Sequence, residues 1–197
     1  ALVEQGLLQE FYIERRNRKG PVGNIYMGKV VRVMPGMQAA FVDIGLERAG
    51  FIHAQDISSL DASGSEISDS PEIQIAQLLR EGQMLVVQVV KEPIASKGAR
   101  LSTHLSIASR YLVHMPRNKH LGISQRIENE EERERLLSLL AQCVEKSAMS
   151  ENAGFILRTA AEGANEEGLL SDIAFLKKLW SSVEQGMQGC NEIKPLY

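Results

Sequence analysis

The feature that most limits the possible folds is a series of five short segments, rich in β-branched residues, between residues 24 and 106. Apolar and polar side chains alternate along several of them, and turn residues such as Pro35 and Gly36 separate them. A period of two is typical of strands that bury one face and expose the other. Five such strands within about eighty residues favour a small closed barrel, with the oligonucleotide-binding (OB) type as the leading candidate. The expected strands are residues 25–34, 39–44, 50–53, 84–90 and 97–105.

The pattern changes to mixed α and β after residue 106. Leu169, Ile173 and Leu176 fall on one face of an expected second helix, and an expected first helix opens on acidic residues that suit the helix dipole. The first thirteen residues predict a hairpin, and residues 58–71 predict a surface loop before a short helix at 72–80. The fold class is therefore predicted to be α+β, with a barrel inserted into an α/β domain. The expected strands and helices after the barrel are 111–115, 122–127, 128–146, 154–159 and 166–183.

The charge balance excludes a protein that coats nucleic acid as a polycation. The chain has 22 Lys and Arg against 25 Asp and Glu, a net charge of −3, so any nucleic-acid site must be local. Cys143 and Cys190 lie far apart, and neither they nor the four scattered histidines show metal-ligand spacing. We therefore expect reduced thiols in a cytoplasmic protein. No run of about 18 apolar residues predicts a membrane span.

The alternation within two of the expected strands predicts where two phenylalanines point. In residues 39–44, Phe41 shares its face with Asp43, which a barrel core cannot easily accept, so Phe41 should point outward. The same argument buries Ile52 and exposes Phe51. Two outward rings on neighbouring strands would form a platform on which unpaired bases stack, and Lys97 and Arg100 could meet the phosphates. The residues alone support equally well a face that packs under another domain or a partner subunit.

A second candidate site lies where an expected strand runs into a loop. Arg158 offers a planar fork of donors that suits phosphate, and Thr159 adds a hydroxyl and a backbone N–H. By itself this pair more often indicates an ordinary surface salt bridge.

The sequence resembles the ribonuclease E/G family of bacterial endoribonucleases. GNIYMGKV, AAFVDIG and SKGARLS occur in order at the spacing of that family's RNA-binding barrel. The resemblance implies that Phe41, Phe51 and Lys97 hold single-stranded RNA. GFILRTAAEG resembles the family's sensor for an RNA 5′ monophosphate, which implies that Arg158 and Thr159 bind the terminal phosphate and that the backbone around Val113 contacts the first base.

The motif SRYLV and the pair Gln125-Arg126 look more like the ribonuclease G branch than the ribonuclease E branch. The resemblance implies a ribonuclease-H-like domain interrupted by the barrel. In this interpretation, residues 1–21 supply its first hairpin, 22–106 the OB-type barrel, 107–185 the remainder with the 5′ sensor, and 186–197 a tail or linker.

The family's catalytic residues are not expected within this chain. In the family, two aspartates in a later domain hold Mg²⁺, and a Cys-x-x-Cys-type link binds structural Zn²⁺ between protomers. Asp43, Asp56 and Asp172 lie in other motifs. Because metal-assisted hydrolysis needs an ion held by carboxylates, we expect this chain alone to bind RNA without cutting it.

The resemblance therefore predicts the recognition part of a bacterial, cytoplasmic endoribonuclease that acts in ribosomal RNA maturation and messenger RNA decay. Its expected partners are single-stranded RNA, preferably 5′-monophosphorylated, and further copies of itself in a dimer or tetramer. Two alternatives stay open: a non-catalytic RNA-binding module with the same barrel, and a structural protein whose barrel face binds another protein.

Overall fold

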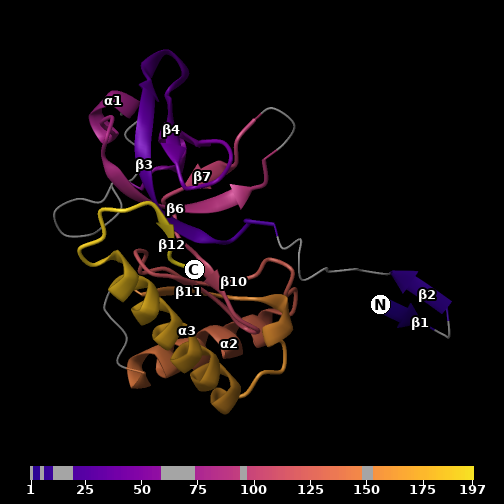
Figure 1. Ribbon diagram of the computed structural model, residues 1–197. Helices are drawn as coiled ribbons and strands as arrows, with labels where there is room; N and C mark the ends of the chain where they lie inside the picture. The colour runs from indigo at the N-terminus through magenta and orange to yellow at the C-terminus, as the bar shows by residue number, and fades with distance from the viewer. Residues whose placement is uncertain (1, 5–6, 11–19, 59–73, 94–96, 148–152) are drawn as a thin grey trace.

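The computed structural model describes residues 2–4, 7–10, 20–58, 74–93, 97–147 and 153–197. Its strands form three sheets. The smallest is an antiparallel pair, β1 (Leu2–Glu4) and β2 (Leu7–Glu10), which matches the expected opening hairpin. That this hairpin belongs to a ribonuclease-H-like domain stays a prediction. The other two sheets belong to a barrel and an α/β unit, which Figure 1 shows one above the other.

The barrel is closed and has five strands, as predicted. They are β3 (Ile25–Met34), β4 (Ala39–Asp43), β5 (Gly50–His53), β6 (Met84–Lys91) and β7 (Arg100–Ser102). They pair in the order β3-β4-β5-β7-β6, and β6 pairs with β3 to close the ring. Only the pair β5–β7 is parallel. The last strand is shorter than the sequence predicted, because pairing ends at Ser102.

The barrel interior is filled by side chains that alternate along its strands. The buried set includes Val30, Val42, Ile52 and Leu101. Gly50 is needed between them, because a Cβ at this position would lie 2.5 Å from Leu101 Cδ1. A short helix, α1 (Ile75–Leu78), packs its buried Ile75 against this core. Residues 59–73, which carry most of the predicted loop and the start of the predicted helix, lie outside the described residues.

The α/β unit consists of a four-stranded sheet covered by two helices. The strands β8 (Ile107–Ala108), β9 (Leu112–Met115), β10 (Leu121–Ile123) and β11 (Gly154–Leu157) pair in the order β10-β11-β9-β8. Figure 1 shows this sheet between the barrel and the two helices, α2 (Glu130–Lys146) and α3 (Glu166–Met187). The core between sheet and helices contains Leu112, Phe155, Leu157, Leu136, Leu140, Ile173 and Leu176.

Strand β3 joins the two units. Its residue Ile25 is buried in the core of the α/β unit, while the next residue, Tyr26, is buried in the barrel core. A last strand, β12 (Lys194–Pro195), pairs with β3 outside the barrel, and the Ile25 backbone exchanges hydrogen bonds with Leu196 and Tyr197. The sequence predicted only a tail or linker over residues 186–197 and no strand, whereas the structure pairs residues 194–197 with β3.

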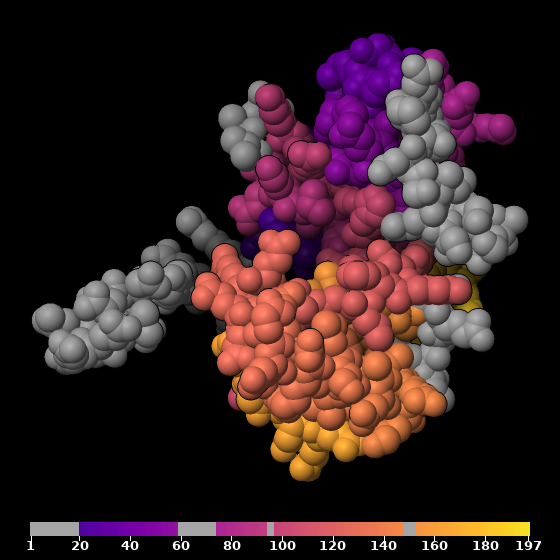
Figure 2. Space-filling model, turned by 180° about the vertical axis from the view of Figure 1, so that it is seen from behind, coloured from indigo at the N-terminus to yellow at the C-terminus, as the bar shows by residue number. Residues whose placement is uncertain are grey.

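The buried Gln88 forms hydrogen bonds at the same junction between the barrel and the α/β unit. Gln88 on β6 donates from Nε2 to the carbonyls of Gly23 (2.8 Å) and Ser106 (2.7 Å). Its Oε1 accepts from the Ser106 N–H at 2.9 Å. Seen from behind, the chain after the barrel runs directly into the α/β unit below it (Figure 2).

Candidate nucleic-acid interface

Phe41 and Phe51 form the aromatic pair that the sequence predicted. They are directly opposite one another on β4 and β5. Their strand neighbours Ala40, Val42 and Ile52 are fully buried, whereas both phenylalanines are only partly buried and so lie on the outer face. The ring centroids are 5.9 Å apart, in an edge-to-face arrangement. The predicted side-chain direction is confirmed.

Asp43, from which the outward direction of Phe41 was predicted, lies at the end of β4. Its Oδ1 accepts a hydrogen bond from the Gly45 N–H at 2.9 Å and so caps the turn after the strand. The carboxylate is thus used locally, outside the barrel core, as the argument from alternation required.

Arg100 is adjacent to the pair, in register with Phe51 on the parallel strand β7. Its guanidinium makes an ion pair with Asp56 at 3.0 Å. The Asp56 carbonyl in turn accepts from the Thr103 N–H at 2.8 Å and from the Ser102 hydroxyl at 3.0 Å. The arginine is therefore held beside the rings, and a carboxylate partly balances its charge. Lys97, three residues earlier in the chain, is exposed.

The sequence interpretation missed two residues of this face. Asp56 was assigned no role there, because its partner Arg100 is 44 residues away and alternation does not show such pairs. Arg32 was missed because a β-bulge between Val30 and Arg32 breaks the alternation of β3. With the bulge, Arg32 lies directly opposite Phe41.

The residues of the second predicted site also come together. Val113 on β9 pairs with Ile156 on β11, and the Arg158 N–H continues this pairing by donating to the Tyr111 carbonyl at 2.8 Å. Arg158 and Thr159 are exposed and start a 3₁₀ turn, Thr159–Ala161. Val113 and Ile156 are partly buried, on the sheet face that does not carry the buried Leu112, Phe155 and Leu157.

The Arg158 guanidinium contacts backbone: it donates to the Ser109 carbonyl. The segment that offers this carbonyl is itself fixed by Asp172 of α3. One carboxylate oxygen of Asp172 accepts from the Ser109 hydroxyl at 2.6 Å and from the Tyr111 N–H at 2.7 Å. The carbonyl is neutral, and among the described residues Arg158 forms no ion pair.

The loop after Arg158 is held by α2. Glu132 accepts a hydrogen bond from the Gly163 N–H at 2.8 Å and two from Arg135, whose guanidinium also reaches the Ala164 carbonyl at 3.2 Å. The bonds from Arg135 and from the Gly163 N–H lower the pKa of Glu132 to about 2. The sequence related the acidic start of this helix only to the helix dipole, whereas the Glu132 carboxylate also holds the loop.

The described residues contain no group of three or more His, Cys, Asp or Glu side chains that could hold a metal ion. Cys143 and Cys190 are free thiols. Among the helices of the described part of the chain, none is long and apolar enough to cross a membrane.

Comparison with known proteins gives two family matches. Residues 19–104 match the S1 RNA binding domain, and residues 106–197 match the Ribonuclease E/G family. The chain is 54% identical to ribonuclease G of Haemophilus influenzae over 189 residues and 52% identical to ribonuclease G of Escherichia coli K12 over 185 residues. These alignments cover 93% of this chain and 37% of each relative. Ribonuclease E of a Nostoc species is 36% identical over 95% of this chain and 26% of its own length.

Proposed function

The chain belongs to the ribonuclease E/G family, and from that premise we propose that it is the RNA-recognition part of a single-strand-specific endoribonuclease. It spans 37% of the length of the ribonuclease G relatives, so the activity proposed here is that of a longer protein.

The observation that carries the proposal is the outward pair of Phe41 and Phe51 on the barrel that matches the S1 RNA binding domain. Aromatic rings on such a barrel stack bases whatever their sequence, at about 1–3 kcal/mol per base. Arg100 lies next to Phe51, and Lys97, three residues before Arg100 in the chain, is exposed. These cations would contact the phosphates between the stacked bases.

Titration of a short, unstructured RNA onto this chain tests the platform. Phe41→Ala and Phe51→Ala should each weaken binding by between about five-fold and about 150-fold, which corresponds to the loss of one stacked base at about 1–3 kcal/mol. Phe175→Ala is a matched control, because Phe175 is an exposed phenylalanine on α3. If Phe41→Ala bound RNA as tightly as Phe175→Ala does, the proposed RNA site would be wrong and the alternative of a protein-binding face would gain support.

We propose further that Arg158, Thr159 and the backbone at Val113 recognise a 5′-monophosphorylated RNA end. A phosphate would form charge-assisted hydrogen bonds with Arg158 that are stronger than its present bond to a neutral carbonyl. The Thr159 hydroxyl is next to it, and Val113 lies on the same sheet face within the pairing that places Arg158.

Two RNAs that differ only at the 5′ end test this sensor. The chain should bind the 5′-monophosphate form more tightly than the 5′-hydroxyl form, and Arg158→Gln should remove the difference while binding of the hydroxyl form is unchanged. Arg80→Gln, an exposed arginine beside α1 on the barrel, should keep the difference. A preference that survives in Arg158→Gln would refute the assignment.

We propose RNA cleavage only for the longer protein, with Mg²⁺ as its expected cofactor. Its expected roles are ribosomal RNA maturation and messenger RNA decay. Within the described residues, no group of three or more His, Cys, Asp or Glu side chains could hold magnesium or zinc. Assembly into a homo-oligomer and a cytoplasmic location are proposed on the same family basis. The alternative of a non-catalytic module would be favoured if the full-length protein bound RNA but left it intact in the presence of Mg²⁺.

A further inference from the structure

Four outward side chains form a row across four neighbouring barrel strands. Arg32 on β3 is opposite Phe41 on β4, Phe41 is opposite Phe51 on β5, and Phe51 is in register with Arg100 on β7. Residues opposite one another on adjacent strands point to the same face. Neighbouring strands are about 4.8 Å apart, so the row is about 14 Å long. Two aromatic rings are thus flanked by a guanidinium on each side.

The two ends of this row differ in charge. Arg100 is paired with Asp56 at 3.0 Å, so its net contribution to the local potential is reduced. Arg32 is exposed, and no ion pair involving it occurs between residues that the structure describes. Arg32 therefore carries the uncompensated charge of the row.

Two carboxylates on neighbouring parts of the barrel accept backbone hydrogen bonds and form no ion pair with Arg32 among the described residues. Glu81 accepts a hydrogen bond from the backbone N–H of Val33 at 3.2 Å, and Asp43 caps the turn at Gly45. The β-bulge gives Arg32 its orientation: if alternation continued unbroken from the buried Val30, position 32 would face the barrel core, but the bulge leaves both Val31 and Arg32 exposed.

We propose that Arg32 is a further RNA-binding residue, which contacts the phosphate next to the base stacked on Phe41. This inference rests on the proposed function of the Phe41–Phe51 platform. It extends the RNA site across β3 to the side away from Arg100, so that the bound strand crosses the barrel strands from β7 to β3. A single-stranded RNA would then be held by a cation at each end of the aromatic pair.

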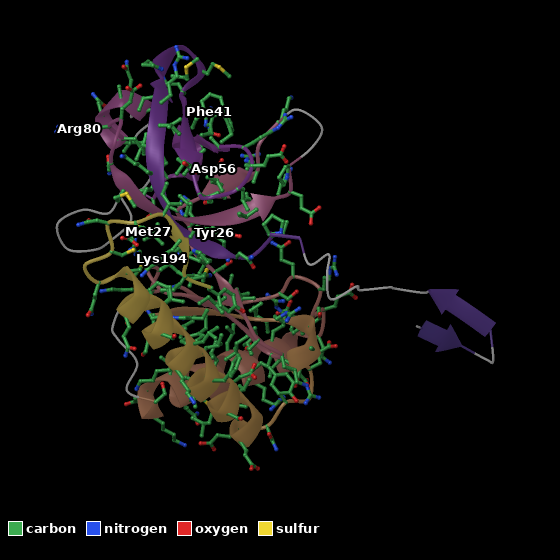
Figure 3. All side chains as sticks on the ribbon, in the orientation of Figure 1. Tyr26, Met27, Phe41, Asp56, Arg80 and Lys194 are labelled. Atoms are coloured by element: carbon green, nitrogen blue, oxygen red, sulfur yellow. The ribbon has the colours of Figure 1, made fainter. Side chains whose placement is uncertain are left out.

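The dependence of RNA affinity on salt tests this contact. In single-stranded nucleic acid, each neutralised phosphate contributes about 0.7 to the slope of log affinity against log salt. Arg32→Gln should therefore lower the slope by about 0.7 and weaken binding about eight-fold at 50 mM salt, with little difference near 1 M. Arg32→Lys should keep the slope. Arg80→Gln removes another exposed arginine, on the other side of β3 from Phe41 (Figure 3), and should leave the slope unchanged.

The outcomes separate the two proposals. If Phe41→Ala and Phe51→Ala weaken binding but Arg32→Gln has the same slope as Arg80→Gln, the contact at Arg32 is wrong and the platform stands. If the phenylalanine variants have no effect, the platform itself fails. Equal thermal unfolding midpoints for wild type and Arg32→Gln would show that the variant is folded.

Discussion

His114 is a residue whose surroundings predict a pH dependence of stability. Its side chain is 1% exposed and stacks on Phe155; Nδ1 is 3.1 Å from the Gly154 carbonyl, and Nε2 has no hydrogen-bond partner among the described residues. Burial lowers the pKa of His114, more than the bond to Gly154 raises it. The unfolded chain therefore binds a proton more readily than the folded one, so the free energy of unfolding should be greatest above pH 6.5 and fall below it.

Urea unfolding between pH 7.5 and pH 5 measures this effect. His114→Phe keeps a ring beside Phe155 but cannot be protonated, so its stability should fall less over this range than that of wild type. His120→Gln, at an exposed position, should follow wild type. Parallel pH curves for wild type and His114→Phe would contradict the prediction.

For single residues, the alternation of apolar and polar side chains predicted which way a side chain points from its strand. The direction of Phe41 followed from Asp43 two positions along the same strand, and the structure confirms it. Arg32 was not predicted because one inserted residue reverses the phase of a strand, and a bulge leaves no mark in the pattern of Val30 to Val33. The pairing of Asp56 with Arg100 depends on the closed barrel itself.

At the scale of elements, the first turn of α2 holds the loop that follows Arg158. Glu132→Gln removes the charge that binds Arg135 and weakens the acceptor of the Gly163 N–H. We expect amide hydrogen exchange at Gly163 to become faster. If the sensor is placed as proposed, the preference for 5′-monophosphorylated RNA should also decrease.

Glu131→Gln is the control, since Glu131 is the exposed neighbour on the same helix. The pKa of Glu132 near 2 lies below its usual value of 4.5, so this interaction stabilises the fold above pH 4.5 and is lost as pH falls toward 2. Equal exchange rates at Gly163 in both variants would show that the carboxylate charge does not hold the loop.

Long elements were predicted better than short ones. Both helices follow from their apolar faces, and each begins after an asparagine whose side chain caps it, Asn129 and Asn165. Helix α3 continues to Met187, four residues beyond the expected end. The two-residue strands β8 and β12 were missed, because their only signal is a hydrogen-bonding partner far away in the sequence.

At the scale of the whole molecule, Gln88 links the barrel to the α/β unit. Gln88→Leu fits an apolar side chain of similar size but leaves the Ser106 N–H and two carbonyls without their partner. An unpaired buried polar group costs about 1–3 kcal/mol, so the free energy of unfolding in urea should fall by at least about that amount. Gln185→Leu, an exposed glutamine on α3, should change it little. A stable Gln88→Leu protein would mean that the junction does not depend on this amide.

The α+β class and the closed barrel were predictable, because the number and spacing of the strands limit the fold. The joint between the units was not. Residues 191–197 have no periodic pattern, and their pairing with β3 requires a strand edge that exists only after the barrel has closed.

The sharing of β3 means that the barrel is not a detachable module. If the chain were cut after residue 106, Ile25 would lose the interior that buries it, and its backbone N–H and C=O would lose their bonds to the residues after β12. Such a truncated piece would display an unpaired strand beside an uncovered apolar side chain, the combination that makes isolated sheets self-associate. The barrel therefore needs the α/β unit to cover Ile25 and to pair with the exposed edge of β3.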